Sequence, residues 1–209
     1  SFKNINSCFN SNIVGTNQVI KFCLKNKIKI IYSATSASLG KNGDDQNLSP
    51  YAFTKSTNMN LIMNLNEWFN LSYEIIYFYN VYGPRQILSS NMAAVIGIFE
   101  ECYKKNQPLP VVLPGTQTRS FTHVHDTVNT CFEAWKLNKN SHYSISSKKS
   151  YSINQVAYFF SKKKIFIPER RGERFKSTIV KKIRNKKIFN RVGKIELKTY
   201  INNFKKQKV

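Results

Sequence analysis

The residues whose spacing best fits proton-transfer chemistry are Tyr51 and Lys55, four positions apart. Residues separated by four lie on the same face of a helix. Ser49 is a favoured N-cap and Pro50 a favoured first helical residue, so both side chains are predicted to project from the first turns of a helix. A phenol has a pKa of about 10 and is a poor base at neutral pH. A neighbouring ammonium stabilises the phenolate and lowers that pKa, which makes a tyrosine usable as a proton-transfer group. A Tyr and a Lys at this spacing also occur in ordinary helices, so the surrounding sequence must show whether this pair is catalytic.

The composition is that of a folded protein. Of 209 residues, 41% are hydrophobic and 13% aromatic, enough for one domain, or one domain and a small subdomain. No apolar run approaches the roughly 20 residues that cross a bilayer, and the first residues form no signal peptide. We expect a soluble, cytoplasmic protein, and the missing initiator Met indicates that Ser1 is not its natural start. Its four dispersed cysteines predict free thiols and no zinc or other metal site.

The net charge of +22 is concentrated in one part of the chain. Residues 1–135 carry 11 basic and 8 acidic side chains, whereas residues 136–209 carry 22 basic and 3 acidic ones. Lys outnumbers Arg 26 to 7, which favours diffuse attraction to phosphate over bidentate recognition. Three interpretations stay open: drift of composition in an AT-rich genome, attraction of a phosphorylated small ligand, and nucleic-acid binding. We favour the first and consider nucleic acid the weakest of the three.

Predicted helices and strands alternate along the chain, which is typical of an α/β fold with a parallel sheet. The predicted helices are Gly15 to Lys27, Tyr51 to Phe69, Ala93 to Lys105, Asp126 to Leu137, Ile153 to Phe160 and Glu196 to Phe204. The predicted strands are Lys29 to Ser33, Tyr73 to Tyr79, Leu109 to Leu113, Arg119 to Val124 and His142 to Ser146. The character of the sequence changes near residue 83, which predicts a nucleotide-binding half followed by a smaller substrate-binding half.

Five short segments add chemistry to the Tyr51–Lys55 pair, in a fixed order. They are Asn12-Ile13-Val14-Gly15-Thr16, Thr35-Ser36-Ala37-Ser38-Leu39-Gly40, Asn80-Val81-Tyr82-Gly83-Pro84-Arg85, Arg119-Ser120-Phe121-Thr122-His123-Val124-His125-Asp126 and Arg170-Arg171-Gly172-Glu173. Read in order, they resemble the extended short-chain dehydrogenase/reductase family, especially NAD-dependent epimerases of the UDP-glucose 4-epimerase type. The resemblance covers nearly the whole chain. It implies a partial Rossmann-like, doubly wound parallel sheet with a smaller C-terminal α/β substrate-binding region.

The resemblance implies domain limits and catalytic roles. Residues 1–83 would be the C-terminal part of an NAD-binding domain, and 84–209 mainly the substrate-binding region, with some segments returning to the sheet. Tyr51 would remove a proton from a sugar hydroxyl that Thr35 orients, and Lys55 would hold the nicotinamide ribose. Asn12 would support the cofactor, together with Tyr51 and Lys55, and Tyr79 would line the nicotinamide side.

The resemblance also implies a partner, a nucleotide-diphosphate sugar. Asn80 would contact its diphosphate and Arg119 would clamp a phosphate, while Thr35 would meet the sugar. Arg170 would contribute a second contact to the diphosphate, and Glu173 would hold a ribose or sugar hydroxyl. His123 is better explained as a structural hydrogen-bonding residue than as a general base. The helices 15–27 and 51–69 would serve a homodimer, as they often do in the family, and no membrane partner is expected.

Related 4,6-dehydratases carry an Asp-Glu pair directly after the Thr, whereas Ser36 and Ala37 follow Thr35 here. The resemblance therefore favours epimerisation or simple oxidoreduction over dehydration.

The sequence departs from the family pattern in several places. It contains no G-x-x-G-x-x-G turn and no ribose-binding Asp after one, the parts that hold a dinucleotide pyrophosphate. Tyr77 stands where Arg is common, and Ser120 replaces the usual Asp. The chain thus resembles the later two-thirds of an enzyme, and we expect it to bind NAD weakly or not at all by itself. The alternatives are an inactive fragment of such an enzyme, a basic polyanion-binding protein, and a nucleotide-sugar dehydratase or reductase.

Overall fold

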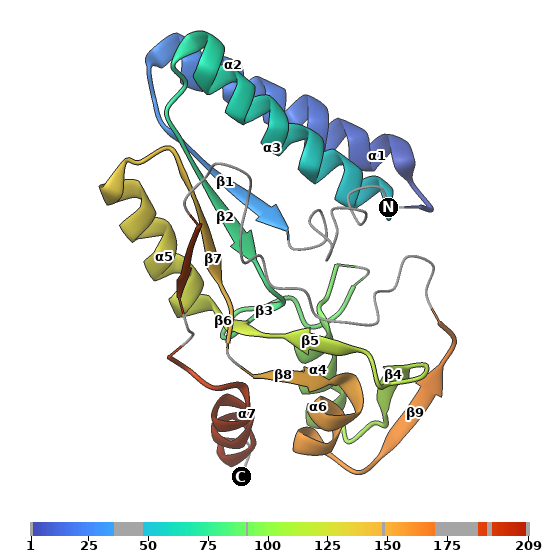
Figure 1. The fold of residues 1–209 in the computed structure, drawn as a ribbon. Coiled ribbons are helices and arrows are strands. Elements are labelled where there is room, and N and C mark those ends of the chain that lie inside the picture. The colour runs from blue at the N-terminus through green and yellow to red at the C-terminus, as the bar shows by residue number, and fades with distance from the viewer. Residues whose placement is uncertain are drawn as a thin grey trace. The chain divides into compact units, whose positions relative to one another are not determined.

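The computed structural model describes residues 2–35, 48–90, 92–147, 149–169, 188–191 and 194–207, with the backbone alone for 188–191. Its helices are α1 (Ile5–Phe9), a π-helical turn (Asn10–Val14), α2 (Gly15–Asn26), α3 (Pro50–Phe69), α4 (Val95–Lys104), α5 (Val124–Leu137), α6 (Ile153–Phe160) and α7 (Leu197–Lys206) (Figure 1). Its strands are β1 (Ile30–Thr35), β2 (Tyr73–Phe78), β3 (Val81–Tyr82), β4 (Leu109–Val112), β5 (Thr118–Ser120), β6 (Thr122–His123), β7 (Ser141–Ile145), β8 (Ser150–Ser152), β9 (Lys164–Ile167) and β10 (Ile188–Arg191). Within the described ranges, none of these helices combines the length and apolar character that spanning a bilayer requires.

Two compact units are formed from these elements. Unit 1 takes in 2–78 and 128–145, with β10, and holds α1 to α3, β1, β2, β7 and most of α5. Unit 2 takes in 79–127, 146–169 and 194–207 among the described residues. The chain therefore crosses between the units several times. The predicted domain limits, 1–83 and 84–209, stay a prediction.

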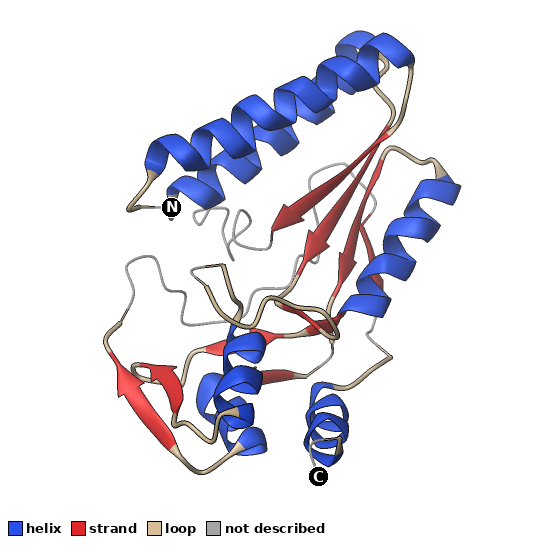
Figure 2. Cartoon of the chain, turned by 180° about the vertical axis from the view of Figure 1, so that it is seen from behind, coloured by secondary structure: helices blue, strands red, loops and turns tan. Residues whose placement is uncertain are grey.

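Unit 1 is built on a parallel four-stranded sheet in the order β1-β2-β7-β10. Figures 1 and 2 show α3, with α1 and α2, along one face of β1 and β2, and α5 along the other. Successive side chains of a strand point to opposite faces. Tyr77 of β2 accordingly reaches Met59 of α3, whereas Ile76 packs with Ala134 of α5. Helices on both faces of a parallel sheet confirm the predicted α/β architecture.

Residue Tyr77, which departs from the family pattern, is fully buried in this sheet. Its ring stacks on His142 of β7 with centroids 5.9 Å apart, and its hydroxyl lies 3.0 Å from His142 Nδ1. On the other face, the buried Glu74 carboxylate accepts the backbone N–H groups of Lys139 and Ser141. Buried polar groups that find partners avoid a desolvation penalty, so both side chains fit an interior position.

The helix before β1 begins earlier than the sequence predicts. The expected lead-in to Gly15 is helical from Ile5, because α1, the π-helical turn and α2 follow one another without interruption. Asn4 caps the start, since its side chain accepts the Ser7 N–H at 3.0 Å. A π-helical turn changes which side chains face a neighbouring helix, and such turns are frequent at functional sites. Here it contains Asn12.

Unit 2 holds a core of its own. Residues from α4, α6, α7 and β4 pack around Phe99 and Phe160, whose ring centroids lie 5.9 Å apart. Three strand pairs surround this core: β3 with β6 and β4 with β9 in parallel, and β5 with β8 antiparallel. The single strand predicted from Arg119 to Val124 is wrong. The chain forms β5 and β6 instead, which pair with different partners because Phe121 between them is buried in the core.

Candidate functional site

The start of α3 presents Tyr51 and Lys55 as the sequence predicts. Ser49 has an extended backbone and its hydroxyl accepts the Ala52 N–H at 3.1 Å, while Pro50 occupies the first helical position. These two residues fix where the helix begins. Tyr51 and Lys55 follow on successive turns of the same face.

Thr35 ends β1 beside Tyr51. Its side chain hydrogen-bonds the Tyr51 phenol, and this bond lowers the pKa of Tyr51. Burial around the phenol oxygen has the larger effect and raises the pKa of Tyr51 above its ordinary value, although 42% of the side chain is exposed. The direction is opposite to the lowering expected from Lys55. The structure thus brings two predicted catalytic residues into contact and leaves the phenol protonated at neutral pH.

The ammonium of Lys55 is engaged by β1, which explains that difference. Lys55 Nζ donates to Ser33 Oγ at 3.2 Å and stands over the Tyr32 ring, 4.7 Å from its centroid. The Tyr32 hydroxyl in turn donates to the Lys55 backbone carbonyl at 3.2 Å. Burial lowers the pKa of Lys55. Tyr32 and Ser33 were missed by sequence reasoning, because the strand KIIYS reads only as a hydrophobic element.

Asn12 reaches the catalytic helix through a chain of hydrogen bonds. Asn12 Nδ2 donates to Thr54 Oγ1 at 2.9 Å, and Thr54 Oγ1 donates to the Tyr51 carbonyl at 3.0 Å. Asn58 Nδ2 donates to the Asn12 carbonyl at 2.6 Å, which takes up a main-chain acceptor in the π-helical turn. Thr54 is fully buried and lies at the centre of this chain. It is a third residue, after Tyr32 and Ser33, that the sequence motif does not single out.

The predicted substrate residues Asn80 and Arg119 both lie in unit 2 and line one pocket of about 240 Å³. Asn80 has a left-handed backbone, with φ of 36°, and its side-chain amide donates to the Ser120 carbonyl at 2.8 Å. Arg119 Nη1 donates to the Thr118 carbonyl at 2.8 Å. The walls are largely apolar, with contributions from Val95, Ile98, Phe99, Pro110, Val112 and Ile153. An amide and a guanidinium in an apolar pocket suit an anionic ligand with a ring.

The remaining predicted residues divide into buried ones and ones outside the described chain. Tyr79 directly precedes Asn80 and is 1% exposed. Arg170 and Glu173 lie outside the described residues. His123 is 4% exposed; its Nδ1 accepts the His125 N–H at 3.2 Å, and its ring packs on Tyr82. Burial and His125 lower the pKa of His123, although Asp126 opposes this.

Gly83 allows this packing around His123. Its φ of 145° is one that other residues rarely adopt, and a Cβ there would lie 2.6 Å from Val124 Cγ1 and 3.2 Å from His123 Nε2. The glycine of the N-x-Y-G-P-R segment is therefore required by backbone conformation and by space.

Comparison with known proteins identifies the family of the chain. Residues 1–146 match the model of the NAD dependent epimerase/dehydratase family, and the chain belongs to that family. It is 29% identical over 155 residues to a Methanocaldococcus jannaschii protein provisionally named UDP-glucose 4-epimerase, covering 69% of this chain and 50% of that protein. It is 31% identical over 162 residues to UDP-N-acetyl-alpha-D-glucosaminuronate decarboxylase of Bacillus cytotoxicus, covering 70% and 50%.

The fold is also found among solved structures. UDP-glucuronic acid 4-epimerase of Bacillus cereus, in complex with UDP-glucuronic acid and NAD, superposes with a TM-score of 0.77 at 22% identity, covering 96% of this chain and 69% of that one. The predicted Rossmann-like fold is thereby confirmed. The chain spans about half the length of the two curated relatives described above.

Proposed function

We propose that this chain supplies the proton-transfer and substrate-binding residues of an NAD-dependent nucleotide-sugar epimerase. The observation that carries the proposal is the Thr35–Tyr51 hydrogen bond, with Lys55 held one turn further along the same helix. Membership of the epimerase/dehydratase family supports it. A Tyr phenol within hydrogen-bonding distance of a Thr hydroxyl can exchange a proton with a sugar hydroxyl that the Thr orients.

Tyr51 takes up the proton of the sugar hydroxyl, and Thr35 orients that hydroxyl. NAD, when bound, would supply a hydride acceptor and a positive charge. Burial raises the pKa of Tyr51 and the Lys55 ammonium is engaged with Ser33 and Tyr32, so the residues of this chain by themselves keep the phenol protonated at neutral pH. Return of the proton to the sugar leaves Tyr51 as a phenolate, so the burial that favours proton uptake by Tyr51 opposes this second step. Lys55 is placed to hold the nicotinamide ribose, and Asn12 keeps the first turns of α3 in position through Thr54.

The residues present fit one end of the cofactor. Tyr51 is partly exposed, and the Lys55 ammonium is a hydrogen-bond donor, which suits the hydroxyls of a ribose. The 209 residues contain no Gly-rich turn for the pyrophosphate. We therefore propose that NAD binding by the enzyme depends on such a turn in addition to these residues.

In unit 2, the Asn80–Arg119 pocket is the proposed seat of the nucleotide diphosphate. Arg119 offers charge-assisted hydrogen bonds to phosphate, and the apolar walls suit a base. Thr35 is followed by Ser36 and Ala37 instead of two acids, so elimination of water has no acid–base pair at that position. This favours epimerisation over dehydration.

The test is a fusion that places a Gly-rich strand–turn–helix segment for the NAD pyrophosphate before this chain. We expect the fusion to interconvert the 4-epimers of a UDP-sugar, followed by NMR of the sugar anomeric protons. A folded, NAD-loaded fusion that converts no UDP-hexose, UDP-N-acetylhexosamine or UDP-uronic acid would contradict the proposal.

A decarboxylase is the second candidate, because the relative with 31% identity is one. A sugar acid oxidised next to its carboxyl-bearing carbon is a β-keto acid, which loses CO₂ readily. The same fusion given a UDP-uronic acid distinguishes the two, since a decarboxylase releases CO₂ and yields a pentose product. An epimerase returns a hexuronic acid of the same mass.

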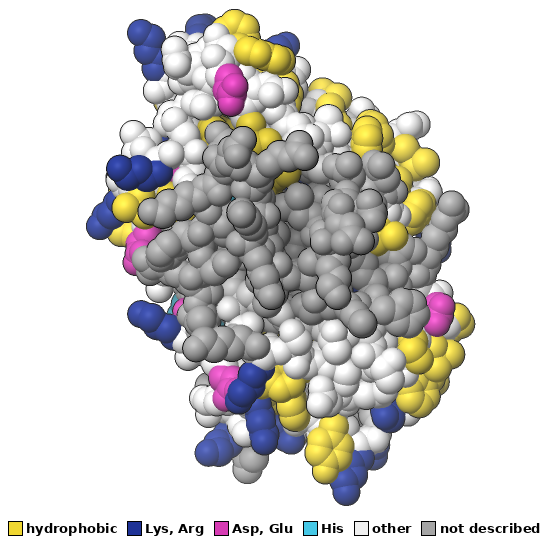
Figure 3. Space-filling model, in the orientation of Figure 1, with side chains coloured by type: hydrophobic (Ala, Val, Ile, Leu, Met, Phe, Trp, Pro, Cys, Tyr) yellow, Lys and Arg dark blue, Asp and Glu magenta, His cyan; other side chains and the backbone are white. Residues whose placement is uncertain are grey.

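We also propose a homodimer through helices 15–27 and 51–69. Large apolar side chains are exposed on α2 and at the end of α3: Val19, Phe22, Trp68 and Phe69 are each more than half exposed. Hydrophobic side chains are visible on the surface over these helices in Figure 3. Sedimentation equilibrium checks this, with Phe22→Asp expected to give monomers.

A further inference from the structure

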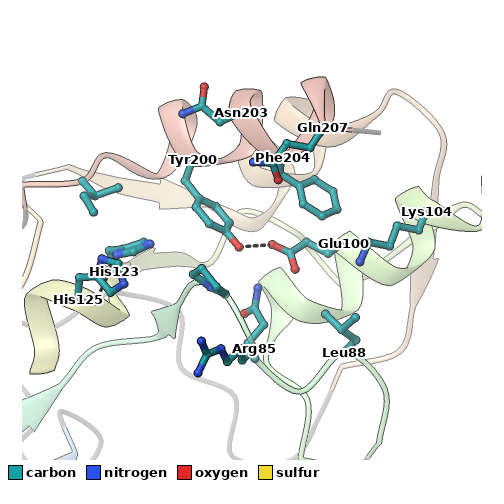
Figure 4. Close-up of a pocket in the computed structure, with 13 residues that line it drawn as sticks. Arg85, Leu88, Glu100, Lys104, His123, His125, Tyr200, Asn203, Phe204 and Gln207 are labelled. Carbon is teal, nitrogen blue, oxygen red and sulfur yellow. Dashed lines mark hydrogen bonds between the residues drawn. The ribbon is translucent and has the colours of Figure 1, made fainter. Parts of the chain in front are cut away.

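A second, larger pocket lies in unit 2, apart from the Asn80–Arg119 pocket. It measures about 620 Å³ and is lined by residues 84–86, by Leu88, by α4 and by α7, with His123 and His125 at one side (Figure 4). Helix α4 contributes to both pockets but with different faces. Val95 and Phe99 line the Asn80–Arg119 pocket, whereas Glu100 and Lys104 line the larger one. About two and a half turns separate Val95 from Lys104, so the two pockets lie on opposite faces of the helix.

The inner part of the larger pocket contains a buried acid and a buried carboxamide. Glu100 is 4% exposed and accepts a hydrogen bond of 2.8 Å from the Tyr200 hydroxyl, which reaches it from α7 (Figure 4). The Gln86 side chain lies within hydrogen-bonding reach of both residues, and this contact lowers the pKa of each, although burial has the larger effect and raises both. Yet Gln86 Nε2 and Oε1 are both buried without a hydrogen-bond partner of normal geometry. Such a group costs about 1–3 kcal/mol unless a ligand or solvent pairs with it.

Gln86 is held in place by the backbone next to it. The Ile87 carbonyl oxygen approaches α4 at Gly97 so closely that a Cβ would collide with it. This contact fixes the segment that carries Arg85 and Gln86 against the helix that carries Glu100. The Gln86 carboxamide therefore belongs to a packed part of unit 2.

The pocket is positively charged at its rim. Arg85 and Lys104 are basic, and Glu100 is the only acid among the described residues that line the pocket; burial raises its pKa. Lys104 Nζ stands 5.5 Å from the centroid of the Phe204 ring. His123 adds an aromatic ring at the opposite side, with Nδ1 already accepting the His125 N–H. The net charge favours an anionic ligand.

We propose that this pocket binds a nucleoside monophosphate, with the edge of the base on Gln86 and the phosphate on Arg85 or Lys104. A carboxamide offers one donor and one acceptor side by side, which is the pattern that pairs with a base edge. The volume lies within the range of small-molecule sites, about 300–1,000 Å³. The site is distinct from the substrate pocket and does not depend on the proposed epimerase activity. Because α4 separates the two pockets, the ligand is placed to act as a regulator of substrate binding.

The test uses methyl NMR on the full 209-residue chain with UMP, AMP, ribose 5-phosphate and inorganic phosphate as probes. Leu88 and Ile195 report the larger pocket, whereas Val95, Val112 and Ile153 report the Asn80–Arg119 pocket. We expect UMP or AMP to shift Leu88 and Ile195 at concentrations at which ribose 5-phosphate and phosphate do not. Unmoved Leu88 and Ile195 signals with both nucleotides would overturn the proposal. Equal shifts with ribose 5-phosphate would also overturn it, since they would show that the base does not contribute to binding.

Variants give an independent readout. Gln86→Leu is expected to weaken nucleotide binding at Leu88 and Ile195 at least tenfold, and Arg119→Leu to leave it unchanged. Arg119→Leu is the matched control, because it alters only the other pocket. If Gln86→Leu does not fold, Gln86→Glu retains the shape of the side chain and introduces a charge that repels the phosphate. Nucleotide binding that survives both Gln86 substitutions would count against the assignment.

Discussion

The two units hold their functional side chains in different ways. In unit 1, the Tyr51 site is a connected network in which Thr35, Lys55 and Asn12 each bond another part of the site. In unit 2, Asn80 and Arg119 donate hydrogen bonds to backbone carbonyls and line an apolar pocket. Proton transfer needs fixed geometry, whereas binding needs shape and charge. We therefore expect changes in unit 1 to act on kcat and changes in unit 2 to act on KM.

The largest effect after Tyr51 itself is expected from Lys55→Met in the active fusion. The variant keeps most of the side-chain volume but removes the ammonium that lies between Ser33 and Tyr32. A lost charged contact near the cofactor and phenol is expected to lower kcat by about 10²–10⁴. Steady-state kinetics at saturating UDP-sugar measure it. An unchanged kcat with a raised KM would contradict the expectation that changes in unit 1 act on kcat.

Arg119→Leu is expected to do the reverse. The loss of one charged hydrogen bond to phosphate costs about 1.5–3 kcal/mol, or roughly 10–150-fold in affinity. KM for the UDP-sugar should rise by this factor with kcat within about threefold of the unaltered fusion. Arg119→Lys is the matched variant and is expected to recover part of the loss, because it keeps the charge but not the fork of donors. A fall in kcat with constant KM would place Arg119 in the chemistry.

Thr54→Val tests whether the network in unit 1 positions Tyr51. Thr54 is fully buried, and the substitution removes the hydroxyl that accepts from the Asn12 side-chain amide, at a nearly unchanged volume. We expect a loss of about 1–3 kcal/mol in the free energy of unfolding, measured with urea. Thr54→Ser keeps the hydroxyl and should recover most of this stability and activity. Equal losses in both variants would mean that the hydroxyl does not carry the effect.

The smallest effect is expected from Glu100→Gln in unit 2, and it depends on pH. Burial raises the pKa of Glu100, so the folded state favours its protonated form. The stability that this provides is fully present below the ordinary Glu pKa of about 4.3 and is lost as pH rises through the higher folded pKa. Gln stays neutral and can still accept from Tyr200, so the variant should gain stability relative to the unaltered chain between pH 4 and pH 7. Urea unfolding across that range measures it, and a pH-independent difference would contradict it.

Much of the fold follows from local patterns in the sequence. The start of α3 was predictable because Ser49 and Pro50 are strong local signals, and the ends of β2 and α6 follow from their apolar runs. The π-helical turn was not, since five residues of a slightly wider helix leave no distinctive pattern. The division of residues 118–123 into two strands was not either, because it depends on Phe121 entering the core of unit 2.

The candidate site was predictable only where residue types carry a motif. Asn80 and Arg119 are 39 positions apart in the sequence, and the resemblance predicted their shared role before the structure placed them on one pocket. Tyr32, Ser33 and Thr54 contact the site through side chains that have no motif of their own. The pKa of Tyr51 could not be obtained from spacing, since burial outweighs the neighbouring groups.

The most direct test of the central claim compares Tyr51→Phe with Tyr32→Phe in the active fusion. Each removes one phenol oxygen from unit 1, but only Tyr51 bonds Thr35, whereas the Tyr32 hydroxyl bonds the Lys55 backbone. If Tyr51 transfers the proton, kcat for UDP-sugar epimerisation falls by about 10²–10⁴ in Tyr51→Phe and by less than about tenfold in Tyr32→Phe. Similar kcat values for the two variants would contradict the assignment of Tyr51 as the proton-transfer residue.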